Sequence, residues 1–247
     1  MQTYGQATHL GFLQLKLDAR TGQIIDYDGK LIPVESSRWA PDPVVAGKLE
    51  QYRSNYPEIQ VVVGKTAARM NRRYIEESDV GNLFADAFVA ASGADIGFIH
   101  SGSLRKDLPA GEIRMVDLLD TYPFVDDVQL KVMSGDQIRR ALEQSLTFER
   151  GLLQVSGLEL SYDLSKPERQ RVVSLSHNGN PVEADDRFTV AAPGFLSEGG
   201  DLYDSFPESD VIGNVGKVSD VILGYFQNHE VVKVPQRGRQ RDVTGSH

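Results

Sequence analysis

The sequence predicts an α+β fold with mixed sheets and packed helices. Segments in which apolar and polar residues alternate, typical of half-buried strands, recur along the 247-residue chain. Segments with apolar residues three or four positions apart, typical of helices, lie among them. These two kinds of segment do not alternate regularly as strand–helix–strand units, and a hairpin signal interrupts them. This order favours α+β over a parallel α/β sheet.

Composition limits the classes of function. The chain is 40% hydrophobic and 25% charged, which is typical of a globular protein with a sizeable core. Its net charge of −9 argues against nucleic-acid binding as the main role, since phosphate backbones need a basic surface. It has no cysteine, which excludes disulfides and thiolate chemistry. No apolar run approaches the roughly 20 residues of a membrane helix, and the first residues lack the pattern of a signal peptide. We therefore expect neither nucleic acid nor membrane among its partners.

The N-terminal part reads as a hairpin followed by a helix. Over residues 8–34, three leucines alternate with polar residues and a Thr-Gly pair supplies the turn. Residues 35–42 are polar and contain a proline, which predicts a loop. Apolar residues on one side of residues 43–52 predict a helix. We place a domain boundary near residue 42.

A short strand at residues 59–64 precedes the clearest helix of the chain. Ser78 is a good N-cap, and Asp79 is favourably placed in the first turn. Apolar residues then recur at helical spacing and predict a buried stripe: Val80, Leu83, Phe84, Ala87, Phe88 and Ala91. Ser-Gly at residues 92–93 ends the helix, and an apolar strand at 96–99 follows.

The second half adds more strands and two helices. Ser134 and Gln137 form a capping box that predicts a helix burying Ile138 and Leu142. The pair Asn178-Gly179 is a strong hairpin signal. Further strands are predicted at residues 128–132, 158–164 and 188–192, and a final helix at 218–226. Residues 233–247 are polar and basic and are expected to form a flexible tail.

Hydrolytic chemistry has no recognisable machinery in this chain. The five histidines show no zinc-ligand spacing. The sequence lacks a Gly-x-Ser-x-Gly nucleophile motif and a P-loop. We therefore expect no catalytic residue and no metal ligand here.

A binding site is indicated where the strand at 96–99 ends. Residues 100–105 read His-Ser-Gly-Ser-Leu-Arg. Small residues let a ligand approach backbone N–H groups, and Arg105 adds a positive charge with a planar donor fork. The segment also fits an ordinary strand-to-loop turn with one solvated arginine, so the local chemistry leaves both interpretations open.

Four motifs in order give the chain a family resemblance. Residues 78–83 read Ser-Asp-Val-Gly-Asn-Leu, and 100–105 are followed by Pro-Ala-Gly at 109–111. Pro-Phe at 123–124 comes next, then Phe-Leu-Ser-Glu-Gly-Gly-Asp at 195–201. Together these motifs resemble the C-terminal, substrate-binding domain of the 5'-nucleotidase and UDP-sugar hydrolase family, over about residues 60–210.

The resemblance implies a nucleotide or nucleoside site. Phe124 and Phe195 match the two aromatics that sandwich the base, although each also fits a core position on sequence context alone. Asp201 matches the acceptor of the ribose hydroxyls. Arg105 matches a cation near the phosphate or ribose. The implied substrate-binding residues are Arg73, His100, Gly102, Arg105, Phe124, Phe195 and Asp201.

Two of these positions depart from the family pattern or leave alternatives. His100 stands where the family usually has Asn, so the base preference is open. Arg73 is the best match for a second arginine, but Arg69 and Arg72 also fit. A solvated arginine cluster fits these three positions as well.

The resemblance also implies how the chain is organised. Residues 1–42 would be the end of an N-terminal metallophosphatase domain, with 4–11 resembling its closing segment. Residues 43–232 would be the substrate-binding domain, and 233–247 the tail. Two divalent metals would lie in the missing metallophosphatase domain, which makes that domain a partner and leaves this chain inactive alone and without a cofactor. The family implies a periplasmic or extracellular location.

Two alternative functions remain at this point. One is a related hydrolase with another substrate, of the 2',3'-cyclic nucleotide phosphodiesterase or thiosulfohydrolase type, which the histidine at position 100 favours. The other is a ligand-binding module with no catalytic partner.

Overall fold

The computed structural model describes residues 7–245. These residues form two units, of which the first ends at Pro57 and the second begins at Glu58. The helix that was predicted to open the second domain, after residue 42, lies within the first unit. None of the described helices is long and apolar enough to cross a membrane.

The first unit contains the predicted hairpin and helix. Strand β1 (His9–Leu17) pairs with β2 (Ile24–Pro33) in antiparallel register, and α1 spans Pro43–Ser54. The Asp42 carboxylate caps α1 by accepting hydrogen bonds from two backbone N–H groups in its first turn. Residues 4–6, part of the segment that resembles the end of a metallophosphatase domain, lie outside the described residues.

One face of the hairpin is apolar and uncovered. The register pairs Leu15 with Tyr27 and Gly11 with Leu31, so leucines and tyrosine share a face. Leu13, Leu15, Tyr27 and Leu31 are all exposed, and no side chain described within residues 7–57 is buried. A two-stranded sheet has little independent stability in water. Within the described residues, this unit therefore has no core of its own.

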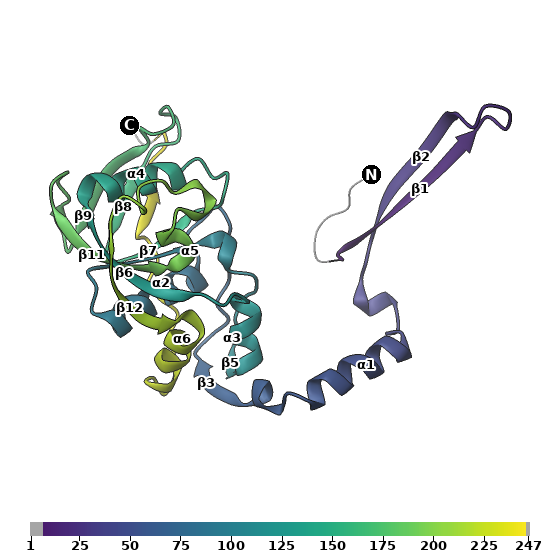
Figure 1. The fold of residues 1–247 in the computed structure, drawn as a ribbon, viewed down its shortest axis with the longest axis horizontal. Coiled ribbons are helices and arrows are strands. Elements are labelled where there is room, and N and C mark those ends of the chain that lie inside the picture. The colour runs from purple at the N-terminus through teal and green to yellow at the C-terminus, as the bar shows by residue number, and fades with distance from the viewer. Residues whose placement is uncertain (1–6, 246–247) are drawn as a thin grey trace. The chain divides into compact units, whose positions relative to one another are not determined.

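The second unit is built around a five-stranded mixed sheet (Figure 1). Its order is β12-β6-β11-β4-β7, in which β11 runs parallel to β4 and the other neighbours are antiparallel. The strands span Ile96–His100 (β4), Asp127–Ser134 (β6), Leu153–Ser156 (β7), Arg187–Pro193 (β11) and Val211–Lys217 (β12). This mixed sheet with packed helices confirms the predicted α+β class.

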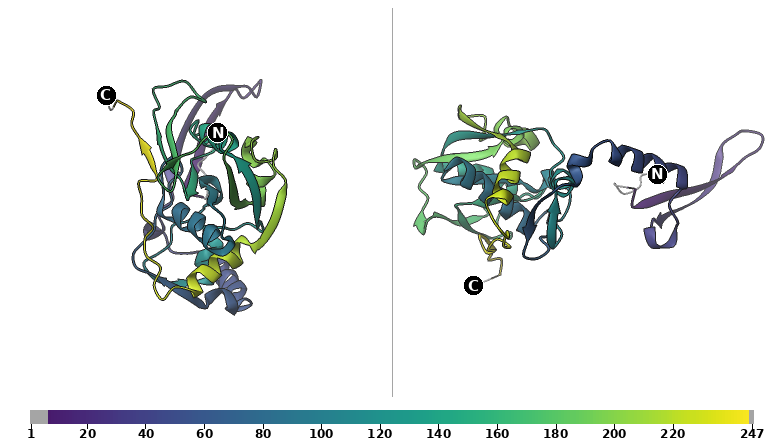
Figure 2. Two further views of the ribbon diagram at one scale, coloured as in Figure 1. Left: turned by 90° about the vertical axis from the view of Figure 1, so that its left-hand side faces the viewer. Right: turned by 90° about the horizontal axis from the view of Figure 1, so that it is seen from below.

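Helices cover both faces of this sheet. Helices α2 (Asp79–Ser92) and α6 (Val218–Gln227) lie side by side on one face (Figures 1 and 2). Helix α4 (Gly135–Ser145) packs on the other. Ser78 caps α2 as predicted, by accepting from the Gly81 N–H at 3.0 Å. The predicted stripe of α2 is buried except for Ala91, which is exposed near the end of the helix.

The sheet divides the core into two layers. Along β4, Ile99 packs with α2 and α6, whereas Ile96 and Phe98 pack with α4 and the strands beyond it. Gly97 allows the close approach of α2, because a Cβ there would lie 2.4 Å from the carbonyl oxygen of Ala85. Both faces of β4 are thus buried, and its polar end at His100 leads into a loop.

Smaller elements complete the second unit. A four-stranded sheet contains β8 (Glu159–Tyr162), β9 (Val172–His177), β10 (Asn180–Pro181) and β13 (Gln240–Asp242). Strand β3 (Val62–Thr66) pairs with β5 (Gly111–Arg114), and short helices span Met115–Thr121 (α3) and Gly194–Ser197 (α5). The strand predicted at residues 59–64 is β3, which begins at Val62 and ends at Thr66. The predicted Asn178-Gly179 turn is confirmed by φ angles of 50° and 78°.

The end of the chain corrects the prediction of a flexible tail. Strand β13 adds in parallel to β8, and Gln240 is buried. The Arg239 guanidinium contacts both carboxylate oxygens of Asp86 at 2.7 Å. Arg237 bonds Asp79 at 2.6 Å. Residues 236–242 are therefore held by α2 and β8. The prediction was wrong because it used composition alone, and composition does not indicate that these basic side chains pair with acidic residues distant in sequence.

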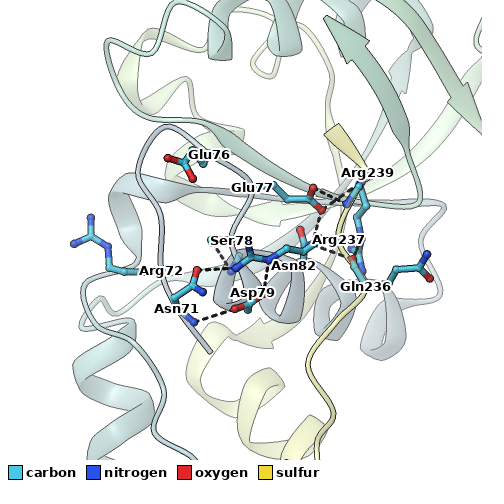
Figure 3. A network of polar contacts seen from close by, with 12 residues as sticks. Asn71, Arg72, Glu76, Glu77, Ser78, Asp79, Asn82, Gln236, Arg237 and Arg239 are labelled. Carbon is cyan, nitrogen blue, oxygen red and sulfur yellow. Dashed lines mark hydrogen bonds and ion pairs between the residues drawn. The ribbon is translucent and has the colours of Figure 1, made fainter. Parts of the chain in front are cut away.

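The predicted motif at residues 78–83 lies in this contact (Figure 3). Asp79 bonds Arg237, and the Asn82 amide donates to the carbonyl of Gln236 at 3.2 Å. The Glu77 carboxylate, just ahead of the motif, accepts from the backbone N–H of Gly238 at 2.8 Å. The motif thus serves to dock the C-terminal segment against the start of α2.

Candidate functional site

Three segments of the predicted site meet at one end of the five-stranded sheet. His100 ends β4, and Phe195 follows the end of β11, which runs parallel to β4. Phe124 precedes β6, whose first residues lie opposite the last residues of β11, with Val128 paired to Pro193. The register therefore brings together residues that are widely separated in sequence.

A cavity of about 550 Å³ lies at this end. It is lined by Tyr74, His100, Gly102, Ser103, Arg105, Tyr122, Phe124, Val125, Asp126, Arg150, Gly194, Phe195, Glu198 and Asp201. Six of the seven predicted site residues are in this set. The exception is Arg73, which is exposed and does not line the cavity.

The alternative arginines for the second cation lie elsewhere as well. Arg69 forms an ion pair with Asp107 at 2.7 Å, and neither Arg69 nor Arg72 lines the cavity. Instead, Arg150 supplies the second guanidinium. The sequence analysis missed Arg150 because only the pairing of strands, and no local motif, places it at the cavity. It precedes β7, whose first residue, Leu153, pairs with His100.

The two phenylalanines are partly exposed within the cavity. Phe124 is 42% exposed and Phe195 is 46% exposed, unlike the fully buried aromatics of the core. The Arg105 guanidinium lies 5.2 Å from the Phe124 ring centroid, within the range of a cation–π contact. The His100 ring lies 5.6 Å from the Phe195 ring at an angle of 30°. Each phenylalanine thus packs against neighbouring side chains and retains exposed surface.

Hydrogen bonds join His100 to two other residues that line the cavity. Its Nε2 lies 2.7 Å from Asp201 Oδ2, and its Nδ1 lies 2.7 Å from Ser103 Oγ. Burial lowers the pKa of His100, the Asp201 carboxylate opposes this, and Arg105 adds to the lowering. A neutral ring with the proton on Nε2 satisfies both contacts, since Asp201 then accepts and Ser103 donates. One carboxylate oxygen of Asp201 is therefore already engaged by the protein.

Backbone geometry fixes the position of Asp201. Its φ angle is +54°, and Leu202 beside it has φ of +68°. Such left-handed conformations are costly for residues other than glycine and cluster at functional sites. Gly102 is also constrained, since a Cβ there would lie 2.7 Å from His100 Nε2. The loop before Arg105 therefore needs a glycine at this position to accommodate the His100–Asp201 contact.

The stability of the protein is expected to depend on the protonation of His100. Above the ordinary histidine pKa of about 6.5, the ring is neutral in both folded and unfolded chains. Because the folded pKa is lowered, the unfolded chain takes up the proton first as the pH falls. The free energy of unfolding should therefore decrease below about pH 6.5, until the pH reaches the lowered pKa of the folded state.

Urea unfolding between pH 8 and pH 5 measures this dependence. His100→Asn, which cannot titrate, should show a flatter profile than the unmodified chain. Equal slopes for His100→Asn and the unmodified chain would contradict the assignment.

The described residues offer no metal centre. Within residues 7–245, no group of three or more His, Cys, Asp or Glu side chains is arranged to hold a metal ion. What the cavity offers is different: aromatic faces, two guanidinium groups and the carboxylates of Asp126, Glu198 and Asp201. This set suits a planar ring joined to polar and anionic groups.

Comparison with known proteins gives a consistent family assignment. The family model described as 5'-nucleotidase, C-terminal domain, matches residues 61–208, which is more than half of the chain. The 5'-nucleotidase-related protein of Glossina morsitans morsitans is 29% identical over 82% of this chain and 41% of its own length. The human 5'-nucleotidase is 26% identical over all of this chain and 48% of its own length. The chain thus spans less than half the length of these relatives.

Known structures show the same fold. A 5'-nucleotidase precursor from Thermus thermophilus superposes with a TM-score of 0.85 at 24% identity, covering 95% of this chain and 50% of that one. The sulfate thiohydrolase SoxB of the same species superposes with a TM-score of 0.78 at 19% identity, covering 96% of this chain and 45% of that one. With the ordered motifs and the matched residues 61–208, these findings place the chain in the 5'-nucleotidase family, as its C-terminal domain.

Proposed function

We propose that this chain is the substrate-binding part of a 5'-nucleotidase-type, metal-dependent phosphoester hydrolase. The observation that carries the proposal is the cavity in which half-exposed Phe124 and Phe195 adjoin Arg105, Arg150 and Asp201. The two rings would stack on a nucleobase, which tolerates different bases because every base has a π-face. Asp201 would accept hydrogen bonds from the sugar, and the guanidinium groups would face the phosphate side.

We further propose that catalysis needs a domain outside this chain. Two divalent metals there would activate water and stabilise the transferred phosphoryl group. Two observations support this division. The chain spans less than half the length of its relatives, and the hairpin β1–β2 leaves an apolar face uncovered. The hairpin would be the end of a metallophosphatase domain that covers this face, which makes that domain the partner of this chain. By the same family relationship, we propose a periplasmic or extracellular location.

A second candidate is a related hydrolase with a different substrate. The observation that favours it is the His100–Asp201 contact, which occupies a carboxylate oxygen that a ribose would otherwise use. A 2',3'-cyclic nucleotide or a sulfur-containing substrate would then replace the nucleoside monophosphate. A ligand-binding module without catalysis is the third candidate, since the described part of the chain has no metal cluster.

A binding panel tests the proposed function. The panel compares nucleosides, nucleoside 5'-monophosphates, 2',3'-cyclic nucleotides and thiosulfate by thermal shift and calorimetry. We expect the monophosphates to bind and to bind more tightly than the nucleosides. Tighter binding of a cyclic nucleotide or of thiosulfate would favour the second candidate. No binding of any nucleoside or nucleotide would contradict the proposal.

Arg105 should contribute to monophosphate binding through its fork as well as its charge. Arg105→Lys keeps the charge but loses two-point contact with an anion, so affinity for the monophosphate should fall about tenfold. Arg73→Lys is the matched control and should leave affinity unchanged, because Arg73 does not line the cavity. Equal affinities of Arg105→Lys and the unmodified chain would mean that Arg105 is only solvated.

A further inference from the structure

Asp126 connects the two segments that carry the phenylalanines of the cavity. It follows Phe124 by two residues, precedes β6 and lines the cavity. Its own backbone is fixed, because its carbonyl oxygen accepts from the N–H of Val218 at the start of α6 at 2.9 Å. The side chain therefore starts from a rigid position on the packed body of the domain.

The Asp126 carboxylate reaches the backbone of the opposite loop. Its Oδ2 accepts a hydrogen bond from the backbone N–H of Phe195 at 3.1 Å. This N–H lies in the first turn of α5, where the helix itself supplies no acceptor. Pro193 is the N-cap of α5 and makes no side-chain capping bond, so the Asp126 carboxylate supplies an acceptor for this turn through Phe195.

The same oxygen also reaches the neighbour of Phe124. The Tyr122 hydroxyl donates to Oδ2 at 3.3 Å, and the Tyr122 ring meets the Phe124 ring edge-on, with centroids 5.4 Å apart. Burial, together with the nearby Asp126 charge, raises the pKa of the Tyr122 hydroxyl, so this group stays protonated and able to donate. One carboxylate oxygen thus acts on the backbone of one phenylalanine and on the packing partner of the other.

The local sequence accommodates this approach. A Cβ at Gly194 would lie 2.7 Å from Asp126 Oδ1, closer than side chains pack. Oδ1 also accepts from the N–H of Asp127 at 2.9 Å, which holds the carboxylate in one orientation. The position of the Asp126 carboxylate therefore requires a residue without a side chain at position 194.

We propose that Asp126 is the positioning residue of this site, which holds the Phe195 turn in place before a ligand binds. The inference rests on the proposed binding of a nucleobase by the Phe124 and Phe195 rings. A loop that must be ordered on binding reduces affinity, whereas a preorganised loop does not. Loss of the carboxylate should therefore weaken binding through Phe195, and should do so only while the Phe195 ring is present.

A double-mutant cycle on adenosine affinity tests this coupling. Asp126→Ala should weaken binding about tenfold in the unmodified chain but less than twofold in the Phe195→Ala background. Asp126→Asn keeps an acceptor for the Phe195 N–H and should lose less than Asp126→Ala. Asp127→Ala is the matched control, since its carboxylate accepts from the Asn214 amide at 2.8 Å, on the side of β12. An equal loss in both backgrounds would overturn the proposal, because Asp126 would then act on the ligand independently.

Hydrogen exchange of the Phe195 amide tests the tether without any ligand. We expect this amide to exchange at least tenfold faster in Asp126→Ala, and in Asp126→Asn by a smaller factor, but not in Asp127→Ala. Unchanged exchange in both Asp126 variants would overturn the proposal. If the unmodified chain bound no nucleoside, the proposed function would fail, and the exchange experiment would still decide whether Asp126 fixes the loop.

Discussion

Replacing Arg239 with Ala is expected to lower the free energy of unfolding of the second unit by about 3 kcal/mol, because it removes a partly buried ion pair together with a hydrogen bond to the backbone. The Arg239 guanidinium makes a two-point contact with Asp86 and also donates to the carbonyl of Val155 at 2.8 Å. Only 17% of the Arg239 side chain and 26% of the Asp86 side chain are exposed, so solvent screens the pair weakly. The change would leave the Asp86 carboxylate partly buried without its cation and would loosen strand β13.

Thermal unfolding measures the loss. A fall of about 3 kcal/mol corresponds to a melting temperature roughly 6–12 °C lower for a unit of this size. Arg241→Ala is the matched control, because Arg241 lies two residues further along the same segment, in β13, and its side chain makes an exposed hydrogen bond to the Gly238 carbonyl. Asp86→Ala should resemble Arg239→Ala, and the double variant should lose less than the sum. Equal melting temperatures for Arg239→Ala and Arg241→Ala would mean that the C-terminal segment does not stabilise the unit.

Phe124→Ala and Phe195→Ala should each lower nucleoside affinity by about 1–3 kcal/mol, the usual contribution of stacking between a base and an aromatic side chain. This is a loss of roughly fivefold to 150-fold. The stability of the protein should change little, because nearly half of each side chain is already exposed. Calorimetric titration with a nucleoside and thermal unfolding of the same variants separate the two effects.

A core phenylalanine provides the comparison. Phe98 is fully buried and packs edge-on against Phe206, with ring centroids 5.7 Å apart. Phe98→Ala should therefore cost about 3–5 kcal/mol of stability. If Phe124→Ala or Phe195→Ala lost stability like Phe98→Ala and kept its affinity, both rings would be packing residues and the stacking proposal would fail.

The sequence predicted those helices and strands that are marked by capping residues at their ends or by a regular apolar pattern along one face. Ser78 and Gly93 bound α2, and Ser134 with Gln137 opens α4 through both bonds of a capping box. The strands that sequence reasoning missed lack such marks. Strand β7 is buried along its whole length and so shows no alternation, and β12 is an edge strand with two register irregularities. Strand β13 exists because Arg237 and Arg239 find acidic partners distant in sequence.

In the site too, residues within motifs could be found from the sequence, whereas residues that enter the cavity through strand pairing could not. Motifs selected His100, Arg105, Phe124, Phe195 and Asp201 as candidates, and the sheet register brings all five to one cavity. Motif spacing could not identify Arg150, since it lies in no motif and enters the cavity only because β7 pairs with β4. Arg73 was selected by its distance from a motif, and that motif serves to bind the C-terminal segment, so proximity to it carried no information about the cavity.

The most direct test of the central proposal is a crystal structure of this chain with a bound nucleoside. The account predicts that the base lies between the Phe124 and Phe195 rings, with the sugar toward Asp201 and the 5' position toward Arg105. A base bound elsewhere, or a cavity that stays empty at saturating nucleoside while the rings remain in place, would contradict it.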